Sequence, residues 1–142
     1  MSRGHRVFFD TNVLVYRFDA DNDKKRNVVG KLIEKHYSAE SGVISTQVIQ
    51  EFINVCTSKF KPSYSSEQID KIIDDLLEPL CQQVPNTTYY KKALRLYEDC
   101  SISFYDSLIL QAALDTGCQT LYTEDLQHGQ KFGKLTVINP FL

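Results

Sequence analysis

Short apolar segments alternate with helical segments along the chain, and this alternation restricts the possible folds more than any other feature. Apolar runs of strand length predict strands at residues 7–9, 43–44, 80–84, 119–122 and 135–138. Helical periodicity and capping residues predict helices at 13–18, 24–39, 46–58, from 66 onward, 87–99 and 103–115. Such alternation predicts an α/β fold with a mainly parallel sheet covered by helices on both faces. The helix pair between the second and third strands is the one departure from it.

Length and composition are those of one ordinary soluble domain. The chain has 142 residues, which suits a single domain over 1–142, with 42% hydrophobic and 24% charged residues. The formal net charge of −2 does not indicate nucleic-acid binding, although local basic clusters can still contact phosphates. The first six residues lead into too few apolar residues for a signal peptide, and no run approaches the roughly 20 of a membrane span. We therefore expect a cytoplasmic protein without membrane contact.

The cysteines are far apart in the sequence, at Cys56, Cys81, Cys100 and Cys118. Zinc ligands usually occur in close pairs, so a zinc site is disfavoured. We expect buried or half-buried reduced thiols, as in a cytosolic protein.

Asp10 ends the first apolar run and opens the turn that continues with Thr11 and Asn12. A carboxylate at the carboxyl end of a buried strand points into the crevice where open α/β sheets bind ligands. The alternative is that Asp10 only caps the helix that follows. Which interpretation holds depends on whether other acids lie nearby.

Asp106 is the acid that is hardest to explain structurally. It shares a helical face with Ile109, Leu110 and Ala113, whereas the polar side of this helix is expected at Ser107, Gln111 and Asp115. An unpaired buried carboxylate is costly or has a shifted pKa. The alternative is that Asp106, in the first turn, only complements the helix dipole.

Two further acids occupy comparable positions. Glu51 borders the apolar face of its helix, with Gln50, Asn54 and Thr57 on the solvent side, so it is either a site residue or a surface side chain. Asp125 follows an apolar strand as Asp10 does, and a turn acid or N-cap is the alternative there. The pattern does not distinguish Asp125 from Glu124.

Several converging carboxylates predict a site for a hard divalent cation. The carboxylates repel one another and titrate abnormally unless a cation neutralises them. Mg²⁺ prefers oxygen ligands in octahedral geometry and retains waters. Such ions activate water and stabilise the attacking and leaving oxygens in phosphodiester hydrolysis.

Four segments together resemble the PIN-domain ribonucleases, especially the VapC-type toxins of bacterial toxin–antitoxin pairs. The matching segments are residues 7–14, 45–52, 104–109 and 121–126, followed by Gly129 and the C-terminal residues 135–141. The resemblance spans essentially the whole chain, and its strength lies in the order and spacing of four individually weak motifs. One departure is Ser107, where alanine is frequent.

The resemblance implies a three-layer α/β/α sandwich around a central, mainly parallel sheet of four or five strands. It implies that Asp10, Glu51, Asp106 and Asp125 are the family's four acids, of which Asp10, Asp106 and Asp125 bind the metal. Thr11, Asn12 and Thr123 match its supporting residues. The activity implied is that of an endoribonuclease dependent on Mg²⁺ or Mn²⁺, hydrolysing phosphodiester bonds of single-stranded or looped RNA.

The same resemblance implies a homodimer that is inhibited by a small antitoxin protein, whose basic residue inserts among the acids. Candidate phosphate contacts, each otherwise a solvated surface, are Lys24, Lys25, Arg26, Lys59, Lys61, Lys91, Lys92, Arg95, Lys131 and Lys134. Tyr64, Tyr89 and Tyr90 either stack on bases or pack in turns.

Two other functions remain open. One is a catalytically weak RNA-binding or antitoxin-docking module, in keeping with the modest basic charge. The other is a metal-dependent phosphatase acting on small phosphoesters. Asn12 argues against a phosphatase of the haloacid dehalogenase type, because the second acid of that enzyme's DxD motif is missing.

Overall fold

The computed structural model describes residues 4–142, so the first half of the N-terminal segment considered for a signal peptide lies outside the described residues. The strands are β1 (Val7–Phe9), β2 (Gly42–Ser45), β3 (Cys81–Gln83), β4 (Thr120–Tyr122), β5 (Lys131–Phe132) and β6 (Leu135–Ile138). The α-helices are α1 (Thr11–Leu14), α2 (Asp23–Ser38), α3 (Thr46–Ser58), α4 (Ser66–Ile72), α5 (Glu78–Leu80), α6 (Thr87–Cys100) and α7 (Phe104–Asp115). A 3₁₀ turn, Val15–Phe18, extends α1, and a π-helical segment, Ile73–Leu77, joins α4 to α5.

The strands form one sheet in the order β3-β2-β1-β4-β6-β5. All neighbouring pairs are parallel except β5 and β6. The predicted mainly parallel sheet and its five strands are therefore confirmed, but the sheet has six strands rather than four or five. The sixth, β5, has only two residues and pairs across a tight turn at Gly133, whose φ is +59°. So short a strand carries no hydrophobic period that sequence reasoning can detect.

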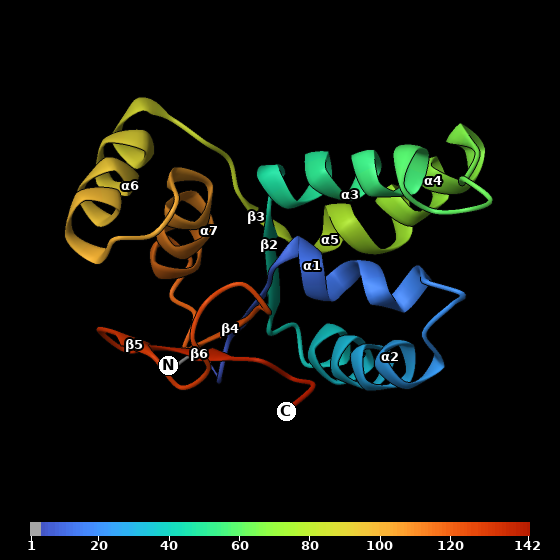
Figure 1. Cartoon of the computed structure of the whole chain (residues 1–142), viewed down its shortest axis with the longest axis horizontal. Coiled ribbons are helices and arrows are strands. Elements are labelled where there is room, and N and C mark those ends of the chain that lie inside the picture. Colours follow the sequence, from blue (N-terminus) through green and yellow to red (C-terminus); the bar gives the residue numbers. More distant parts are fainter. Residues whose placement is uncertain (1–3) are drawn as a thin grey trace.

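Helices cover both faces of the sheet, as an α/β/α sandwich requires. Figure 1 shows α6 and α7 on one side of the sheet and α1, α2 and α5 on the other. No helix within residues 4–142 is long and apolar enough to cross a membrane. All four cysteines belong to the described part and are free, with Cys56 and Cys118 buried, as predicted.

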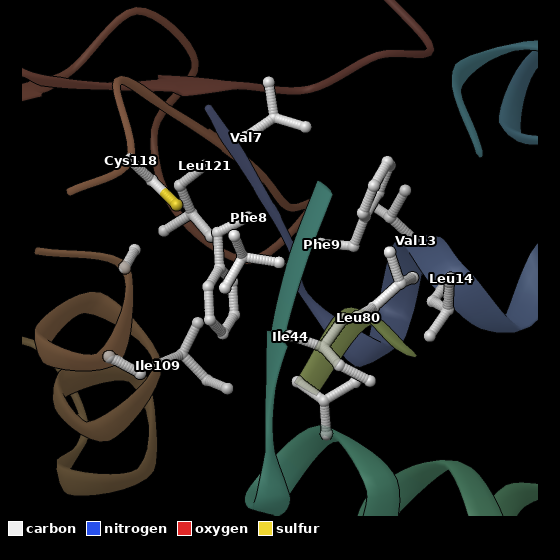
Figure 2. Packing of buried hydrophobic residues seen from close by; sticks show 14 of the residues in the cluster. Val7, Phe8, Phe9, Val13, Leu14, Ile44, Leu80, Ile109, Cys118 and Leu121 are labelled. Atoms are coloured by element: carbon white, nitrogen blue, oxygen red, sulfur yellow. The ribbon is translucent and has the colours of Figure 1, made fainter. Parts of the chain in front are cut away.

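The central strand β1 is buried on both faces. Phe8 and Phe9 are fully buried, and because successive strand residues point to opposite faces, they enter different layers of the core. In Figure 2, Phe8 points toward Ile109 of α7, whereas Phe9 points toward Val13 and the opposite helical layer. Packing on both faces holds the carboxyl end of β1, where Asp10 follows, in a defined position.

The predicted polar side of α7 is confirmed at Asp115, which is exposed, but is wrong at Ser107 and Gln111. Ser107 is fully buried and Gln111 is 8% exposed, although both were expected to face solvent. The reason is that α7 lies between the sheet and α6, so two of its sides are covered. Ser107 compensates for its burial by donating a hydrogen bond to the Ser103 carbonyl, at 2.9 Å.

Candidate active site

Asp10 lies where β1 ends, beside the end of β4. Phe9 pairs in register with Tyr122, and the Asp10 N–H donates to the Tyr122 carbonyl at 3.0 Å. Asp10 is only 6% exposed and is the N-cap of α1, since its Oδ1 accepts the Thr11 N–H at 2.7 Å. The capping role is therefore real. It leaves the second carboxylate oxygen, Oδ2, for other contacts.

Thr123 is the residue that holds the second oxygen of Asp10. Its fully buried hydroxyl donates to Asp10 Oδ2 at 2.8 Å. The same hydroxyl oxygen accepts from the Asp125 N–H at 3.1 Å and from Asn12 Nδ2 at 3.3 Å. A hydroxyl has one proton and two lone pairs, so Thr123 is saturated. This network places a donor on each Asp10 oxygen and suits the ionised carboxylate.

Burial opposes that ionisation. Removal from water raises the pKa of Asp10 to about 7, and repulsion from Glu51 and Asp125 adds to the increase, while the bonds from Thr123 and Thr11 partly oppose it. Within residues 4–142, no lysine or arginine forms an ion pair with Asp10. The site thus combines hydrogen bonds arranged for a negative charge with surroundings that disfavour it.

Glu51 joins the site through Thr11. The Thr11 hydroxyl donates to Glu51 Oε1 at 2.7 Å, which links α1 to the middle of α3. Glu51 is half-buried, while Gln50, Asn54 and Thr57 are exposed, so its predicted boundary position is confirmed. Its carboxylate is bonded to Thr11 and faces the surroundings of Asp10, which a surface side chain would not do.

Asp106 lies in the first turn of α7, after the N-cap Ser103, whose hydroxyl accepts the Asp106 N–H at 3.0 Å. Its side chain is half-buried. Burial raises the pKa of Asp106, repulsion from Asp125 adds to the increase, and the bond with Ser103 opposes it. Both sequence interpretations therefore hold in part, because the residue sits at the dipole end of the helix and close to another acid.

The structure distinguishes Asp125 from Glu124. Glu124 forms an ion pair with Lys25 at 2.7 Å, and its N–H is bonded to Asn12 Oδ1 at 3.2 Å. Asp125 is exposed, and its charge acts on both Asp10 and Asp106. Asp125 thus belongs to the acidic site, while Glu124 anchors the loop that carries it.

Lys25 is a residue whose role the sequence did not indicate. Considered as a phosphate contact, it instead lies 4.5 Å from the centroid of the Tyr16 ring and 4.7 Å from that of Phe141, besides its ion pair with Glu124. These contacts tie α2, the 3₁₀ turn and the C-terminus to the loop after β4. No spacing rule predicts such contacts between residues so far apart in sequence.

The four acids act on one another electrostatically, since Glu51 and Asp125 repel Asp10, and Asp125 repels Asp106. Yet no group of three or more His, Cys, Asp or Glu side chains in residues 4–142 is arranged to hold a metal ion. The chemistry of the donors nevertheless fits a hard divalent cation, because all are carboxylate oxygens and their mutual repulsion is what such a cation relieves. The side chains would have to rearrange for such a cation to bind.

Comparison with known proteins identifies the family of the chain. The family model described as PIN domain matches residues 7–131, which include all four acids. No curated protein matches the chain in sequence.

Three solved structures share the fold of this chain. VapC20 of Mycobacterium tuberculosis, described as a sarcin-ricin loop cleaving toxin, is 13% identical with a TM-score of 0.60, over 84% of this chain and 89% of that one. FitAcB of Neisseria gonorrhoeae is also 13% identical, with a TM-score of 0.61 over 95% and 98%. VapBC2 of Rickettsia felis, bound to a DNA fragment from its promoter, is 23% identical, with a TM-score of 0.58 over 92% and 96%. At these identities the likeness shows a shared fold.

Proposed function

Because this chain belongs to the PIN domain family, we propose that it is a metal-dependent endoribonuclease that acts as the toxin of a toxin–antitoxin pair. It hydrolyses RNA phosphodiester bonds with Mg²⁺ or Mn²⁺ at Asp10, Asp106 and Asp125, and Glu51 completes the catalytic group. The proposal includes a cytoplasmic location and a homodimer.

The main observation behind this proposal is the environment of the Asp10 carboxylate, which is buried but hydrogen-bonded at both oxygens. Its two oxygens accept hydrogen bonds from Thr11 and Thr123, while burial and neighbouring acids raise its pKa to about 7. A purely structural carboxylate at this depth would be expected to have a cationic side chain beside it. A divalent cation bound at the acids would stabilise the buried, ionised carboxylate that the hydrogen-bond donors also favour.

Each residue of the site has a distinct task in this mechanism. When bound, the cation neutralises the acids and activates water for attack on phosphorus. Thr123 and Thr11 orient the two oxygens of Asp10. The Thr11 hydroxyl also holds Glu51 by one oxygen, so that the other is left to accept a proton from the attacking water. Asn12 and Thr123 hold the start of the loop that presents Asp125.

Two of the lysines considered as phosphate contacts lie beside the supporting residues of the site. Lys59 and Lys61 line a pocket of about 440 Å³ together with Asn12 and the acids Asp19, Asp21 and Glu124. Lysines there attract the RNA backbone without reading its sequence. This placement supports RNA as the substrate although the net charge of the chain is −2.

The toxin role and the antitoxin partner are supported by the fold neighbours. One is described as a toxin that cleaves the sarcin-ricin loop, and another is VapBC2 bound to promoter DNA. A basic antitoxin side chain inserted among the acids would supply the missing positive charge in place of the metal, as an arginine fork facing carboxylates can.

The activity is tested with purified protein and RNA in Mg²⁺ or Mn²⁺ and in EDTA. We expect cleavage only with metal, and a loss of roughly 100- to 1,000-fold in Asp10→Asn and Asp106→Asn, as for other groups that stabilise developing charge. Asp70→Asn, an exposed acid on α4, is the matched control and should retain activity. Wild-type cleavage rates in both site variants would refute the mechanism.

The assignment of Asp125 rather than Glu124 has its own matched pair. Asp125→Asn should lose activity as Asp106→Asn does, whereas Glu124→Gln should lose less, because Glu124 acts through the loop. Equal losses of activity in the two variants would contradict the assignment of Asp125 rather than Glu124 to the site.

A second candidate is an RNA-binding or antitoxin-docking module with little catalysis. The observation that favours it is that no three acids in residues 4–142 are arranged to hold a metal ion. Salt-dependent RNA binding without metal-dependent cleavage would support it. Mg²⁺ or Mn²⁺ that raises the Tm of wild type but not of Asp10→Asn would argue against it.

A further inference from the structure

A pocket that no acid lines opens between α3, the segment after β3 and the start of α7. Its volume is about 280 Å³, close to the lower limit of roughly 300 Å³ for small-molecule sites. Aromatic rings and amides form most of its lining, chiefly Tyr89, Tyr90, Phe104, Tyr105, Gln47 and Gln50. None of its lining residues is charged. Such a pocket suits a small, neutral, flat group and not a phosphate.

The pocket adjoins the acidic site on two helices. Gln50 on α3 directly precedes Glu51, and Tyr105 on α7 directly precedes Asp106. Gln47 Nε2 donates to the Tyr105 carbonyl at 3.4 Å, which joins the two helices at the pocket. Two pocket residues are therefore direct chain neighbours of two of the acids.

The aromatic lining combines an anchored ring with exposed ones. Tyr89 is 5% exposed and its hydroxyl donates to the Leu108 carbonyl at 2.6 Å. Tyr105 is 69% exposed and Tyr90 is 43% exposed. Exposed tyrosine rings such as Tyr105 and Tyr90 are side chains on which single-stranded bases commonly stack.

Gln47 contributes an acceptor without a donor. Its Oε1 is buried and accepts no hydrogen bond from any residue in 4–142. The amide cannot be reversed to remedy this, because the Tyr105 carbonyl only accepts and must face the nitrogen. Because the oxygen is buried, an incoming N–H group reaches it only when the Gln47 side chain turns toward the pocket. Each nucleobase offers such a group on its pairing edge.

We propose that this aromatic–amide pocket binds one nucleobase of a single-stranded RNA, next to the phosphate presented to the acids. The base stacks on Tyr105, and Gln47 accepts a hydrogen bond from its pairing edge. The proposal rests on the proposed ribonuclease function and adds to it a base-binding subsite formed by Tyr105 and Gln47.

The experiment measures binding and cleavage separately. Labelled RNA octamers of A, C or U are titrated with the full-length protein in EDTA, followed by fluorescence anisotropy, and kcat and KM are measured on a mixed-sequence RNA with Mn²⁺. We expect Tyr105→Leu to weaken binding of all three octamers about tenfold and to raise KM more than it lowers kcat. Tyr105→Phe keeps the ring and should behave as wild type. Tyr37→Leu removes an exposed tyrosine that does not line this pocket and is the control.

Gln47→Leu tests the hydrogen bond to the base. We expect all three octamers to bind roughly fivefold more weakly than they do to wild type, because each base offers an N–H group to the acceptor that is lost. Equal binding and KM for Tyr105→Leu and wild type would overturn the proposal while cleavage by wild type still upheld the ribonuclease. Loss of a dimer in Tyr105→Leu, measured by light scattering, would instead mark the pocket as a protein interface. Wild type that neither binds nor cleaves RNA would overturn both proposals.

Discussion

Two buried titratable groups beside β1 respond to burial in different ways. His36, near the end of α2, packs against Phe9 with ring centroids 6.2 Å apart, and Asp10 follows directly after Phe9. Burial lowers the pKa of His36 and raises that of Asp10, so both shifts favour the neutral form. The hydrogen bonds of His36 are consistent with the neutral form. One ring nitrogen is hydrogen-bonded to Ser41, and the other, Nε2, has no partner within residues 4–142.

The hydrogen bonds of Asp10 favour its ionised form, whereas burial favours the neutral form. Thr11 and Thr123 both donate to its carboxylate, and donors favour the charged form. Hydrogen bonding and burial therefore act together on His36 and against each other on Asp10. The comparison teaches that burial alone does not identify a functional residue. A functional residue is better indicated when its hydrogen bonds favour the charged form while its burial favours the neutral form.

The largest expected effect is a pH-dependent stability of the metal-free protein. Asp10 has a folded pKa of about 7 against 3.8 unfolded, so its contribution is fully favourable below pH 3.8 and is lost as pH rises through 7. The loss amounts to about 4 kcal/mol at most. Urea unfolding in EDTA across this range should show wild type losing stability relative to Asp10→Asn. Parallel curves for the two proteins would break the comparison, because burial would then not raise the pKa of Asp10.

A smaller effect is expected at Thr123, the hub of the network. Thr123→Val removes the donor to Asp10 and the acceptor for Asn12 and Asp125, so kcat/KM should fall roughly 10- to 100-fold, as for other residues that orient metal ligands. Thr123→Ser keeps the hydroxyl and should recover most of the activity. If kcat/KM falls equally in Thr123→Val and Thr123→Ser, a change in packing rather than loss of hydrogen bonding explains the loss.

His36 should affect stability alone. Its pKa is lowered, so its contribution is fully present above pH 6.5 and is lost as pH falls below that value. Replacing both partners, His36→Leu with Ser41→Ala, should change stability by no more than about 1 kcal/mol at pH 8. The double variant should also reduce the decline toward acid pH. RNA cleavage at pH 8 should remain as in wild type, and a large loss would place His36 in the site.

The smallest effect is expected at the other end of α2. Lys25→Met keeps apolar contact with Tyr16 and Phe141 but leaves Glu124 unpaired, which should cost about 0.5–1 kcal/mol for so partly exposed a pair. We expect activity to fall a few-fold, because the loop that carries Asp125 loses an anchor. A drop as large as that of Thr123→Val would make Lys25 part of the site.

Most of the fold follows from local patterns in the sequence. The five longer strands and the helices were predictable because apolar runs and capping residues act over a few positions, as the caps Asn22, Ser45 and Asn86 illustrate. The two-residue β5 was not predictable, since its pairing depends on a neighbouring strand. The polar side expected on α7 was wrong at Ser107 and Gln111 for a similar reason, because α6 covers it.

By itself the sequence determined the alternation of strands and helices, and with it the edge where Asp10 and Asp125 follow their strands. Periodicity and chain order are local properties, so they can be recognised without coordinates. Only the tertiary structure decided that Thr123 saturates its hydrogen bonds at Asp10, that Lys25 pairs with Glu124, and that Gln47 bonds to Tyr105 while its Oε1 is buried without a donor from residues 4–142. Those contacts join residues about 60 to 110 positions apart, and their energies depend on distance and burial, which no local pattern contains.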